Sequence, residues 1–515
     1  MDFLNTFLGI EFGSTRIKAV LCDNEAKVLA QGSFSWENSF INGHWTYPEE
    51  LFTKGLADCY ESLLEDVKEK YNEIPTTYGA IGISGMMHGY IALDKDYKLL
   101  APFRTWRDTT TSTAADELTQ LFDENIPLRW SVSHLYQAIL NKEEHLGELS
   151  HITTLSGYMH YLLTGENNLG IGDASGMFPI ASGEFNIQYA TKLDEKIAEK
   201  GYNLKTLDLL PNIVLAGAKA GTLTEKGAAL LDRSGNLKSG IPFCAPEGDA
   251  ATGMVAVNAV TMGEGSVSAG TSAFAMLVVP SKPSEINRDV DVVSTPDGKD
   301  VAMIHVNNCC GEIDAWVNLF DEFSKLSGNK ISKGKIYDLL YENTLNSSSD
   351  CGGISAYNFI SAEPIINIDS PCPSIMRNKA AMSLADFFKA QIYATVSALA
   401  IGVEDFKEKE KVNISNFKAS GGIFKTPKIA QQIYADALGC PVTLAETAGE
   451  GGAWGMAILA LYLKNSDLRF DKWLNEKIFN NCKSTTLNNT EKGQKEFQTY
   501  LTNYKNNLSK HFEVK

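Results

Sequence analysis

The chain has 515 residues, which is too long for a single hydrophobic core, so at least two domains are expected. Hydrophobic residues make up 44% and charged residues 21%, an ordinary globular balance, and the formal net charge is −17. This acidity argues against nucleic acids and anionic membranes as partners, because binding to either needs basic patches. It does not exclude a phosphorylated small ligand, which backbone N–H groups can bind.

Neither a signal peptide nor a membrane span is expected. The N-terminus lacks the positive region and the apolar run of a signal peptide. The most apolar stretch, 380–403, contains charged residues and is typical of an amphipathic core helix, so we expect a cytoplasmic protein. The nine cysteines include no C-x-x-C pair, which indicates buried, reduced thiols. The adjacent Cys309 and Cys310 suit neither a metal site nor an easy disulfide.

The first half of the chain alternates predicted strands and helices. Apolar alternation and β-branched residues predict three strands in 7–34, and residues 48–70 have the apolar period of a helix. The other elements expected here are two strands around a glycine-flanked loop in 78–94, helices in 112–122, 130–165 and 191–200, a polar turn at 173–176, and an apolar strand before Asp249.

The second half repeats the theme of the first. Residues 263–279 form a predicted hairpin with a small, hydroxyl-bearing turn, as residues 8–23 do, so we expect a duplicated α/β domain with a cleft between the copies. The remaining expectations are a polar excursion at 281–300, helices in 336–341, 384–406 and 450–462, a strand–glycine turn–helix–strand unit in 417–446, and a surface helix with a frayed end beyond 467.

Glu11 ends the first predicted strand, and the turn Gly13-Ser14-Thr15-Arg16 follows it. A carboxylate beside such a turn can hold Mg²⁺ through water, while the N–H groups of the turn cradle a phosphate. The alternative, an ordinary hairpin with a surface Glu, fits this stretch equally well.

Two later loops carry side chains that suit a sugar. His88 lies in Ser84-Gly85-Met86-Met87-His88-Gly89, where a structural histidine is the alternative. The ring of Trp106 could pack on the C–H groups of a sugar, and the carboxylate of Asp108 could accept hydrogen bonds from its hydroxyls. The alternative is that Trp106 lies at an interface and Asp108 caps a helix.

Asp249 follows an apolar strand and Gly248, and it precedes a helix start rich in small residues. A base near a phosphate-cradling turn, such as Gly270-Thr271-Ser272, is what phosphoryl transfer to a hydroxyl requires. Taken alone, Asp249 would be an N-cap and the turn an ordinary hairpin.

Paired glycines at 421–422 and 449–452 could admit a nucleotide base or ribose close to the backbone. Neither pair forms a G-x-G-x-x-G fingerprint, and no Walker G-x-x-x-x-G-K-[ST] occurs, which argues against the Rossmann and P-loop classes.

Together these stretches resemble the FGGY family of carbohydrate kinases over residues 7–465. The resemblance rests on LGIEFGSTRIKAVL, IGISGMMHGYIALD, TWRDTTT, YLLTGE with DASGMF, PEGDAATGM, GSVSAGTS, ASGGIFKTP and EGGAWGMAILA. It implies two duplicated actin/hexokinase/Hsp70-like (ribonuclease H-like) ATPase domains with a cleft between them, a sugar-binding domain at 1–258 and an ATP-binding domain at 259–515. SGMMHG is similar to the sugar loop of xylulokinase-like members, so ATP-dependent phosphorylation of a xylulose-like ketose is expected.

The resemblance also implies roles for individual residues. Asp249 would be the general base, and Glu11 and Asp249 would hold Mg²⁺ beside the ATP phosphates. The ketose site would be lined by Met87, His88, Trp106 and Asp108. The ATP site would comprise two phosphate loops and two glycine turns: Ser14, Thr15, Gly270, Thr271, Ser272, Gly421, Gly422, Lys425, Gly451 and Gly452. Homodimers are frequent in the family, so the resemblance also suggests a homodimer.

Three positions depart from the family pattern. The family usually has Asp where this chain has Glu11, which is one methylene longer. Xylulokinases have Asn and glycerol kinases Gln where this chain has Ala250, so one hydrogen bond to the sugar is missing. Glu363-Pro364 is retained without the preceding Ser-Gly.

Three other functions stay open at this stage. The acceptor could be ribulose, fuculose, rhamnulose, sedoheptulose or glycerol. Glu11 and Ala250 motivate a catalytically weak sugar-sensing homologue. An actin- or Hsp70-like ATPase machine is disfavoured by the His/Trp/Asp set.

Overall fold

The computed structural model describes residues 2–425 and 428–512, which form two compact units. The first unit comprises Met1–Val260, Glu285–Val301 and Glu450–Asn481; the second comprises Thr261–Ser284, Ala302–Gly449 and Cys482–Lys515. The division of the chain into domains at residue 258 stays a prediction. The assignment of sugar binding to one domain and ATP binding to the other stays a prediction.

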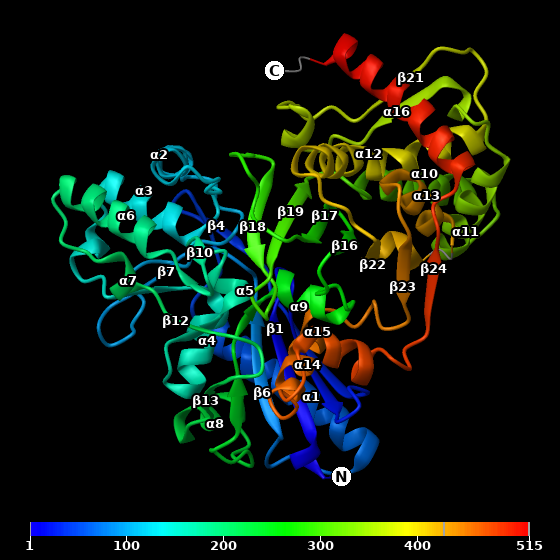
Figure 1. Cartoon of the computed structure of the whole chain (residues 1–515). Coiled ribbons are helices and arrows are strands. Elements are labelled where there is room, and N and C mark those ends of the chain that lie inside the picture. The colour runs from blue at the N-terminus through cyan, green and yellow to red at the C-terminus, as the bar shows by residue number, and fades with distance from the viewer. Residues whose placement is uncertain (1, 426–427, 513–515) are drawn as a thin grey trace. The chain divides into compact units, whose positions relative to one another are not determined.

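The first unit is built on a mixed sheet with the strand order β13-β14-β6-β1-β2-β3, and β15 also pairs with β6 (Figure 1). Strands β1 and β2 form the expected antiparallel hairpin, and β6 runs parallel to β1. The strands are β1 (Thr6–Phe12), β2 (Arg16–Asp23), β3 (Val28–Ser35), β6 (Ala80–Gly85), β13 (Lys219–Thr222), β14 (Pro242–Cys244) and β15 (Glu247–Gly248).

Side-chain alternation along β1 decides which way Glu11 points. Ile10 and Phe12 lie in one buried cluster with Phe52 and Tyr60 of helix α1 (Glu50–Tyr71). Because successive strand residues face opposite sides, Glu11 points away from α1. It accepts a hydrogen bond of 3.2 Å from the N–H of Ala453 in helix α14 (Gly452–Tyr462).

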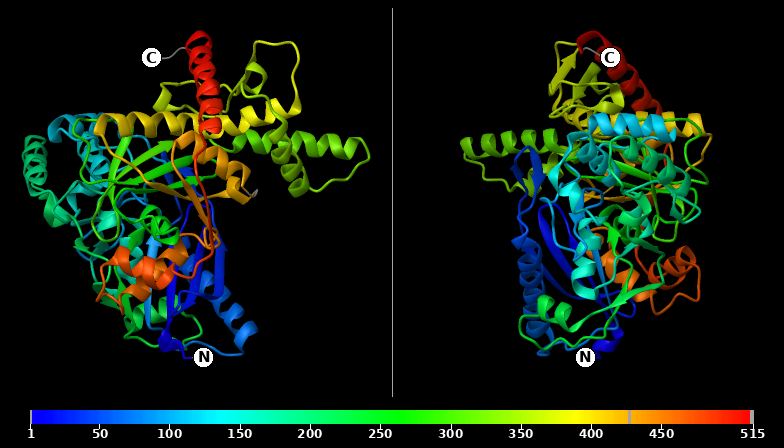
Figure 2. Two further views of the ribbon diagram at one scale, coloured as in Figure 1. Left: turned by 45° about the vertical axis from the view of Figure 1, so that its right-hand side comes forward. Right: turned by 90° about the vertical axis from the view of Figure 1, so that its left-hand side faces the viewer.

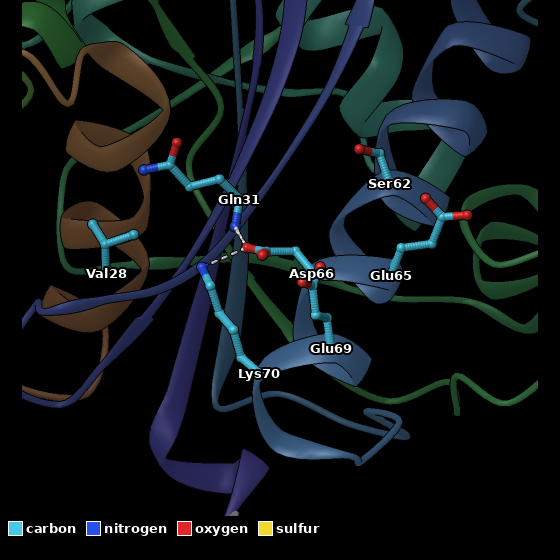
Figure 3. Close-up of a pocket in the computed structure, with 7 residues that line it drawn as sticks. All are labelled: Val28, Gln31, Ser62, Glu65, Asp66, Glu69 and Lys70. Atoms are coloured by element: carbon cyan, nitrogen blue, oxygen red, sulfur yellow. Dashed lines mark hydrogen bonds and ion pairs between the residues drawn. The ribbon is translucent and has the colours of Figure 1, made fainter.

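Strand β3 is the free edge of this sheet, and side chains of α1 cover its polar groups. The N–H of Gln31 donates to Oδ2 of Asp66 at 2.8 Å, and Nζ of Lys70 lies 2.8 Å from the same oxygen (Figure 3). An open hollow between β3 and α1 is lined by Val28, Gln31, Ser62, Glu65, Asp66, Glu69 and Lys70. Capping the edge in this way protects it from pairing with another chain.

A second buried cluster in the first unit packs the helices between β7 and β13, with Trp130, Leu135 and Leu193 among its members. The further elements of this unit are β4 (Ser39–Ile41), β5 (His44–Thr46), β7 (Ile91–Leu93), α2 (Ser112–Phe122), α3 (Ser131–Asn141), β8 (His151–Thr153), α4 (Leu155–Thr164), β9 (Asn168–Gly170), α5 (Ile171–Ala174), β10 (Ile180–Ala181), β11 (Glu184–Phe185), α6 (Ile187–Glu199), α7 (Thr206–Leu209), β12 (Asn212–Val214), α8 (Glu225–Leu231), α9 (Asp249–Ala256), β18 (Val290–Ser294) and α15 (Phe470–Trp473).

Two sequence expectations in this unit are wrong. The stretch 281–300, expected as a polar excursion, contains the buried strand β18, in which the N–H of Ser294 donates to Oγ of Ser175. In the expected polar turn at 173–176, residues 173–174 end helix α5 and only 175–176 form a turn, and all four residues are buried. In both places the polar side chains suggested exposure to solvent, but they form hydrogen bonds inside the protein.

The second unit repeats the strand arrangement of the first. Its sheet contains the order β19-β17-β16-β22-β23-β24, in which β16 and β17 form an antiparallel hairpin and β22 runs parallel to β16. The same hairpin with a parallel third strand is made by β1, β2 and β6, so the duplicated α/β theme expected from the sequence is confirmed. The strands are β16 (Glu264–Ala269), β17 (Ala273–Val278), β19 (Asp300–Val306), β20 (Ile354–Tyr357), β21 (Ser374–Arg377), β22 (Asn416–Ser420), β23 (Val442–Ala445) and β24 (Ser484–Leu487).

Helix α12 (Leu384–Glu410) is the core helix of the second unit, and the C-terminal helix α16 packs on it (Figure 2). Among the described residues it is the one helix long and apolar enough to cross a membrane, but 78% of its most apolar window is buried inside the protein. Tyr500 of α16 donates to the carbonyl of Ala390, so the tail helix is half-buried. The other helices are α10 (Gly311–Leu326), α11 (Lys333–Asn343), α13 (Ile429–Leu438) and α16 (Glu491–His511).

Candidate active site

Asp249 is the first residue of α9, and its carboxylate does not cap that helix. The N-cap residue is Gly248, and no side chain makes a capping bond there. Oδ1 of Asp249 instead accepts a hydrogen bond of 3.1 Å from the N–H of Met87, on the loop after β6. Since β15 pairs in parallel with β6, Gly248 stands opposite Gly85, and the two strand ends bring Asp249 to this loop.

The loop after β6 presents Met87 and His88, both buried. His88 has a φ of +70°, a conformation uncommon outside glycine, and Gly89 follows with a φ of +86°. Nδ1 of His88 lies 3.1 Å from the carbonyl of Gly176, and its ring stacks on Trp130. The structure thus brings Met87, His88 and Asp249 together, as expected.

Trp106 and Asp108 lie on the loop between β7 and α2, and they differ in accessibility. Trp106 is 37% exposed, and its Nε1 donates to Oγ of Ser14 at 3.3 Å. Asp108 is 1% exposed; its Oδ1 accepts from the N–H and the hydroxyl of Thr110, and its Oδ2 lies 2.5 Å from Nδ1 of His44.

His44, which the sequence analysis did not identify, thus occupies one oxygen of the Asp108 carboxylate. Burial alone would raise the pKa of Asp108, but hydrogen bonds from Thr110, the electrostatic effect of the nearby His134 and a hydrogen bond with His44 hold it below its ordinary value. Asp108 is therefore ionised and well placed to orient His44, whose side chain is 27% exposed.

Glu11 and Asp249 are close enough for their charges to interact. Burial, and then the charge of Asp249, raise the pKa of Glu11 to about 7, and burial also raises the pKa of Asp249. Two facing carboxylates are the oxygen donors that Mg²⁺ takes, and Mg²⁺ commonly completes its shell with water and substrate phosphates. No cluster of three or more metal-binding side chains occurs in the described part of the chain.

The turn between β1 and β2 contains Ser14 and Thr15, and its carbonyl groups already have donors. Nε1 of Trp36 donates to the carbonyl of Gly13 at 2.7 Å, and the hydroxyl of Tyr47 donates to that of Ser14 at 2.6 Å. The N–H groups are therefore the polar groups that this turn can offer to an anion.

The turn between β16 and β17 has the same design in the second unit. The N–H groups of Cys309 and Cys310 donate to the carbonyls of Thr271 and Gly270, at 2.9 and 3.0 Å. The carbonyl of Ser272 accepts from the N–H of Gly270. Here too the carbonyls are occupied, which suits a turn that presents N–H groups to phosphate.

Gly421 and Gly422 follow β22 and lie beside that turn, because β22 pairs in parallel with β16 up to Ser268 opposite Ser420. Gly421 has a φ of +110°, and a Cβ there would stand 2.1 Å from the carbonyl oxygen of Ala269, so only glycine fits. Gly422 begins the 3₁₀ turn η6 (Gly422–Lys425), which carries the exposed Lys425.

Gly451 and Gly452 belong to the first unit, and Gly452 lies beside Glu11. A Cβ on Gly452 would stand 2.3 Å from Oε1 of Glu11. The assignment of both glycines to the ATP site stays a prediction.

A buried pair of carboxylates, Asp173 and Glu247, lies behind the Met87 loop and was missed by sequence reasoning. Oδ2 of Asp173 accepts from Thr154 at 2.7 Å and from Ser156, while its buried Oδ1 has no hydrogen-bond partner among the described residues. A Cβ on Gly248 would stand 3.2 Å from that Oδ1. Burial raises the pKa of Asp173 to about 7 and that of Glu247 well above its ordinary value.

Glu363, noted as a residual family feature, is fully buried in the second unit. Its carboxylate accepts from the N–H groups of Asn307 and Asn308 and from Nδ2 of Asn308. All of these contacts are internal to the protein, so Glu363 anchors the segment that leads to Cys309.

Comparisons with known proteins agree over nearly the whole chain. The model of the FGGY family of carbohydrate kinases, N-terminal domain, matches residues 6–256, and that of the C-terminal domain matches residues 265–463. Xylulose kinase from Haemophilus influenzae is 23% identical over 472 residues, which is 88% of this chain and 90% of that protein.

Two solved structures from Lactobacillus acidophilus superpose on the chain. A ligand-bound xylulose kinase gives a TM-score of 0.78 at 16% identity and covers 98% of this chain and 99% of its own. A gluconate kinase gives 0.79 at 15% identity, with the same coverage. These likenesses show the fold expected from the sequence, a two-domain, mixed α/β, actin/hexokinase-like ATPase architecture.

Proposed function

Because this chain belongs to the FGGY family of carbohydrate kinases, we propose that it transfers the γ-phosphate of ATP to a hydroxyl of a xylulose-like ketose, with Asp249 as the general base. Carbohydrate kinase activity follows from the family, whereas the sugar and the residue roles are the proposal. The naming of its relative from H. influenzae as a xylulose kinase supports the choice of sugar.

The observation that carries the base assignment is the hydrogen bond between Asp249 and Met87. An N-cap would keep the carboxylate on its own helix, but here it is directed to the loop that presents Met87 and His88. A carboxylate with a raised pKa beside a sugar loop can accept the proton of a hydroxyl as that hydroxyl attacks phosphorus.

On the sugar side, Asp108 acts through His44 in this proposal. Both Asp108 oxygens have protein partners, so its expected direct contact with the ketose is replaced by the imidazole that it orients. Trp106 adds an exposed ring that can pack on the C–H face of a sugar.

The N–H groups of the β1–β2 and β16–β17 turns would bind the ATP phosphates, and the space above Gly421 and Gly422 would take the adenosine. Turns of this kind stabilise the charge that spreads over the transferring phosphoryl group. Glu11 and Asp249 would hold Mg²⁺, which supplies charge neutralisation to the phosphates when it is bound.

A panel of acceptors in an ADP-release assay tests this function. D-Xylulose is expected to give the highest kcat/KM among D-xylulose, L-xylulose, ribulose, fuculose, rhamnulose, sedoheptulose, glycerol and gluconate. A higher value for another acceptor would overturn the choice of sugar. Sugar binding without ADP release from any acceptor would favour the sugar-sensing alternative.

A further inference from the structure

Cys309 and Cys310 form a vicinal dithiol at the junction between β19 and α10. Their Sγ atoms lie 3.5 Å apart, and both thiols are free. Cys309 is buried, whereas Cys310 is partly exposed, so the pair can be approached from one side. Nothing in the kinase chemistry described above uses these sulfurs.

The segment that carries the two thiols is firmly held. Glu363 binds the N–H groups of the two preceding residues, and Nδ2 of Asn358 donates to the carbonyl of Cys309 at 2.9 Å. On its other side the segment is bonded to the phosphate turn, since the N–H groups of Cys309 and Cys310 donate to the carbonyls of Thr271 and Gly270. A group bound at the dithiol therefore lies next to the turn.

Two common roles of cysteine pairs do not fit here. Neighbouring Cα atoms are about 3.8 Å apart, closer than the roughly 4.4–6.8 Å that a disulfide prefers, so oxidation would require the held backbone to move. Zinc takes four ligands in structural sites, and the described residues contain no group of three or more metal-binding side chains.

An atom that needs only two sulfurs fits the observed spacing. Two bonds of about 2.3 Å from a soft centre, meeting at about 100°, place their sulfurs roughly 3.5 Å apart. This is the separation of the Sγ atoms of Cys309 and Cys310. Trivalent arsenic in an organic arsenoxide is such a centre, because it keeps its carbon substituent and binds two thiols.

We propose that Cys309 and Cys310 are a binding site for trivalent arsenicals, and that the organic substituent of a bound arsenical impairs ATP use because it lies beside the β16–β17 turn. An arsenoxide R–As=O condenses with both thiols: two S–H bonds break, two As–S bonds form, and the oxide oxygen leaves with both protons as water. Arsenic stays trivalent, so no oxidant or reductant is needed. The effect on ATP rests on the proposed function, whereas binding itself does not.

The thiol of Cys310 is held in the protonated form from which the condensation is written. The hydrogen bond with Cys309, together with burial, raises the pKa of the Cys310 thiol far above its ordinary value. Such a thiol is a poor nucleophile in thiol–disulfide exchange, which proceeds through the thiolate. Condensation with loss of water takes up both thiols in their protonated form.

The test uses phenylarsine oxide and intact-protein mass spectrometry on the full chain. The wild-type protein is expected to retain one arsenical per dithiol in excess 2-mercaptoethanol and to release it to 2,3-dimercaptopropanol, because the second As–S bond forms intramolecularly. Cys310→Ser should lower retention by about 10²-fold or more. Cys372→Ser, which removes an exposed cysteine elsewhere, is the matched control and should retain the arsenical like the wild type.

Equal retention by the wild type and Cys310→Ser would overturn the site. Cys310→Ala, with thermal unfolding measured for every variant, separates loss of the site from misfolding. Retention by the wild type should also raise the KM for ATP by about tenfold or more, and Cys310→Ser should escape this change. Binding without such a change would overturn the coupling to the turn. Absence of kinase activity would refute the proposed function while leaving the binding result intact.

Discussion

Gly452 is predicted to be the residue that makes room for Glu11. A Cβ at position 452 would stand 2.3 Å from Oε1 of Glu11 and 2.8 Å from the hydroxyl oxygen of Thr252. Gly452→Ala should therefore displace the Glu11 carboxylate. Shortening that side chain with Glu11→Asp withdraws the carboxylate by about one C–C bond, or roughly 1.5 Å, and should remove the overlap with Glu11.

The expected change in the free energy of unfolding follows from two opposing contributions. Overpacking of this kind costs about 1–3 kcal/mol, whereas replacing Gly by Ala in a helix gains up to about 1 kcal/mol. A net loss in the free energy of unfolding of about 1–2 kcal/mol is expected for Gly452→Ala in the wild-type background. A smaller loss is expected in the Glu11→Asp background, where only the close contact with Thr252 remains. A loss of about 1–2 kcal/mol corresponds to a roughly 5- to 30-fold change in the ratio of folded to unfolded protein.

A double-mutant cycle measures this coupling. Denaturant unfolding is measured for the wild type, Gly452→Ala, Glu11→Asp and the double variant, and their free energies of unfolding are compared. Gly253→Ala in α9, where a Cβ meets no atom within 4 Å, controls for the change from Gly to Ala in a helix. Effects that add to within about 0.5 kcal/mol would refute the reasoning.

Three further outcomes are expected. Gly421→Ala puts a side chain on a backbone with a φ of +110°, 2.1 Å from a carbonyl oxygen, so the KM for ATP should rise about tenfold or more. Gly422→Ala has open space around the new side chain, so its KM for ATP should stay within about twofold of the wild type. Asp173 has a pKa of about 7 in the fold and about 4 when unfolded, so the native state binds the extra proton and stability falls as the pH rises between these values. Thermal unfolding from pH 5 to pH 7 should show this loss, about 2 kcal/mol, in the wild type, whereas an equal loss in Asp173→Asn would contradict it. His44→Ala should raise the KM for the sugar about tenfold with a smaller change in kcat, and an unchanged KM would remove His44 from the sugar site.

The two hairpins and the strand before Asp249 could be predicted because local patterns determine them. Alternating apolar residues mark β1, β2, β16 and β17, and the small residues at the turns mark their ends. The family resemblance then proposed the site residues, of which the structure brings Met87, His88 and Asp249 together through the register of β15 on β6.

The parts that could not be predicted depend on partners far along the chain. Asp173 is buried because the hydroxyls of Thr154 and Ser156 meet its carboxylate, and strand β18 is buried although its sequence neighbours are polar. His44 carries no motif of its own, and only its contact with Asp108 singles it out. The segment DASG, which belongs to a motif of the family resemblance, places Asp173 among small residues and is the signal that could have singled it out. Only the structure shows that Asp173 is buried.

The replacement of Asp249 by Asn tests the central claim most directly. Asn keeps the size and one oxygen of the side chain but cannot take a proton, so kcat for the best acceptor should fall by about 10²- to 10⁴-fold. ATP affinity, measured by titration calorimetry, should stay within about threefold of the wild type. A kcat for Asp249→Asn within about tenfold of the wild type would contradict the assignment of Asp249 as the general base.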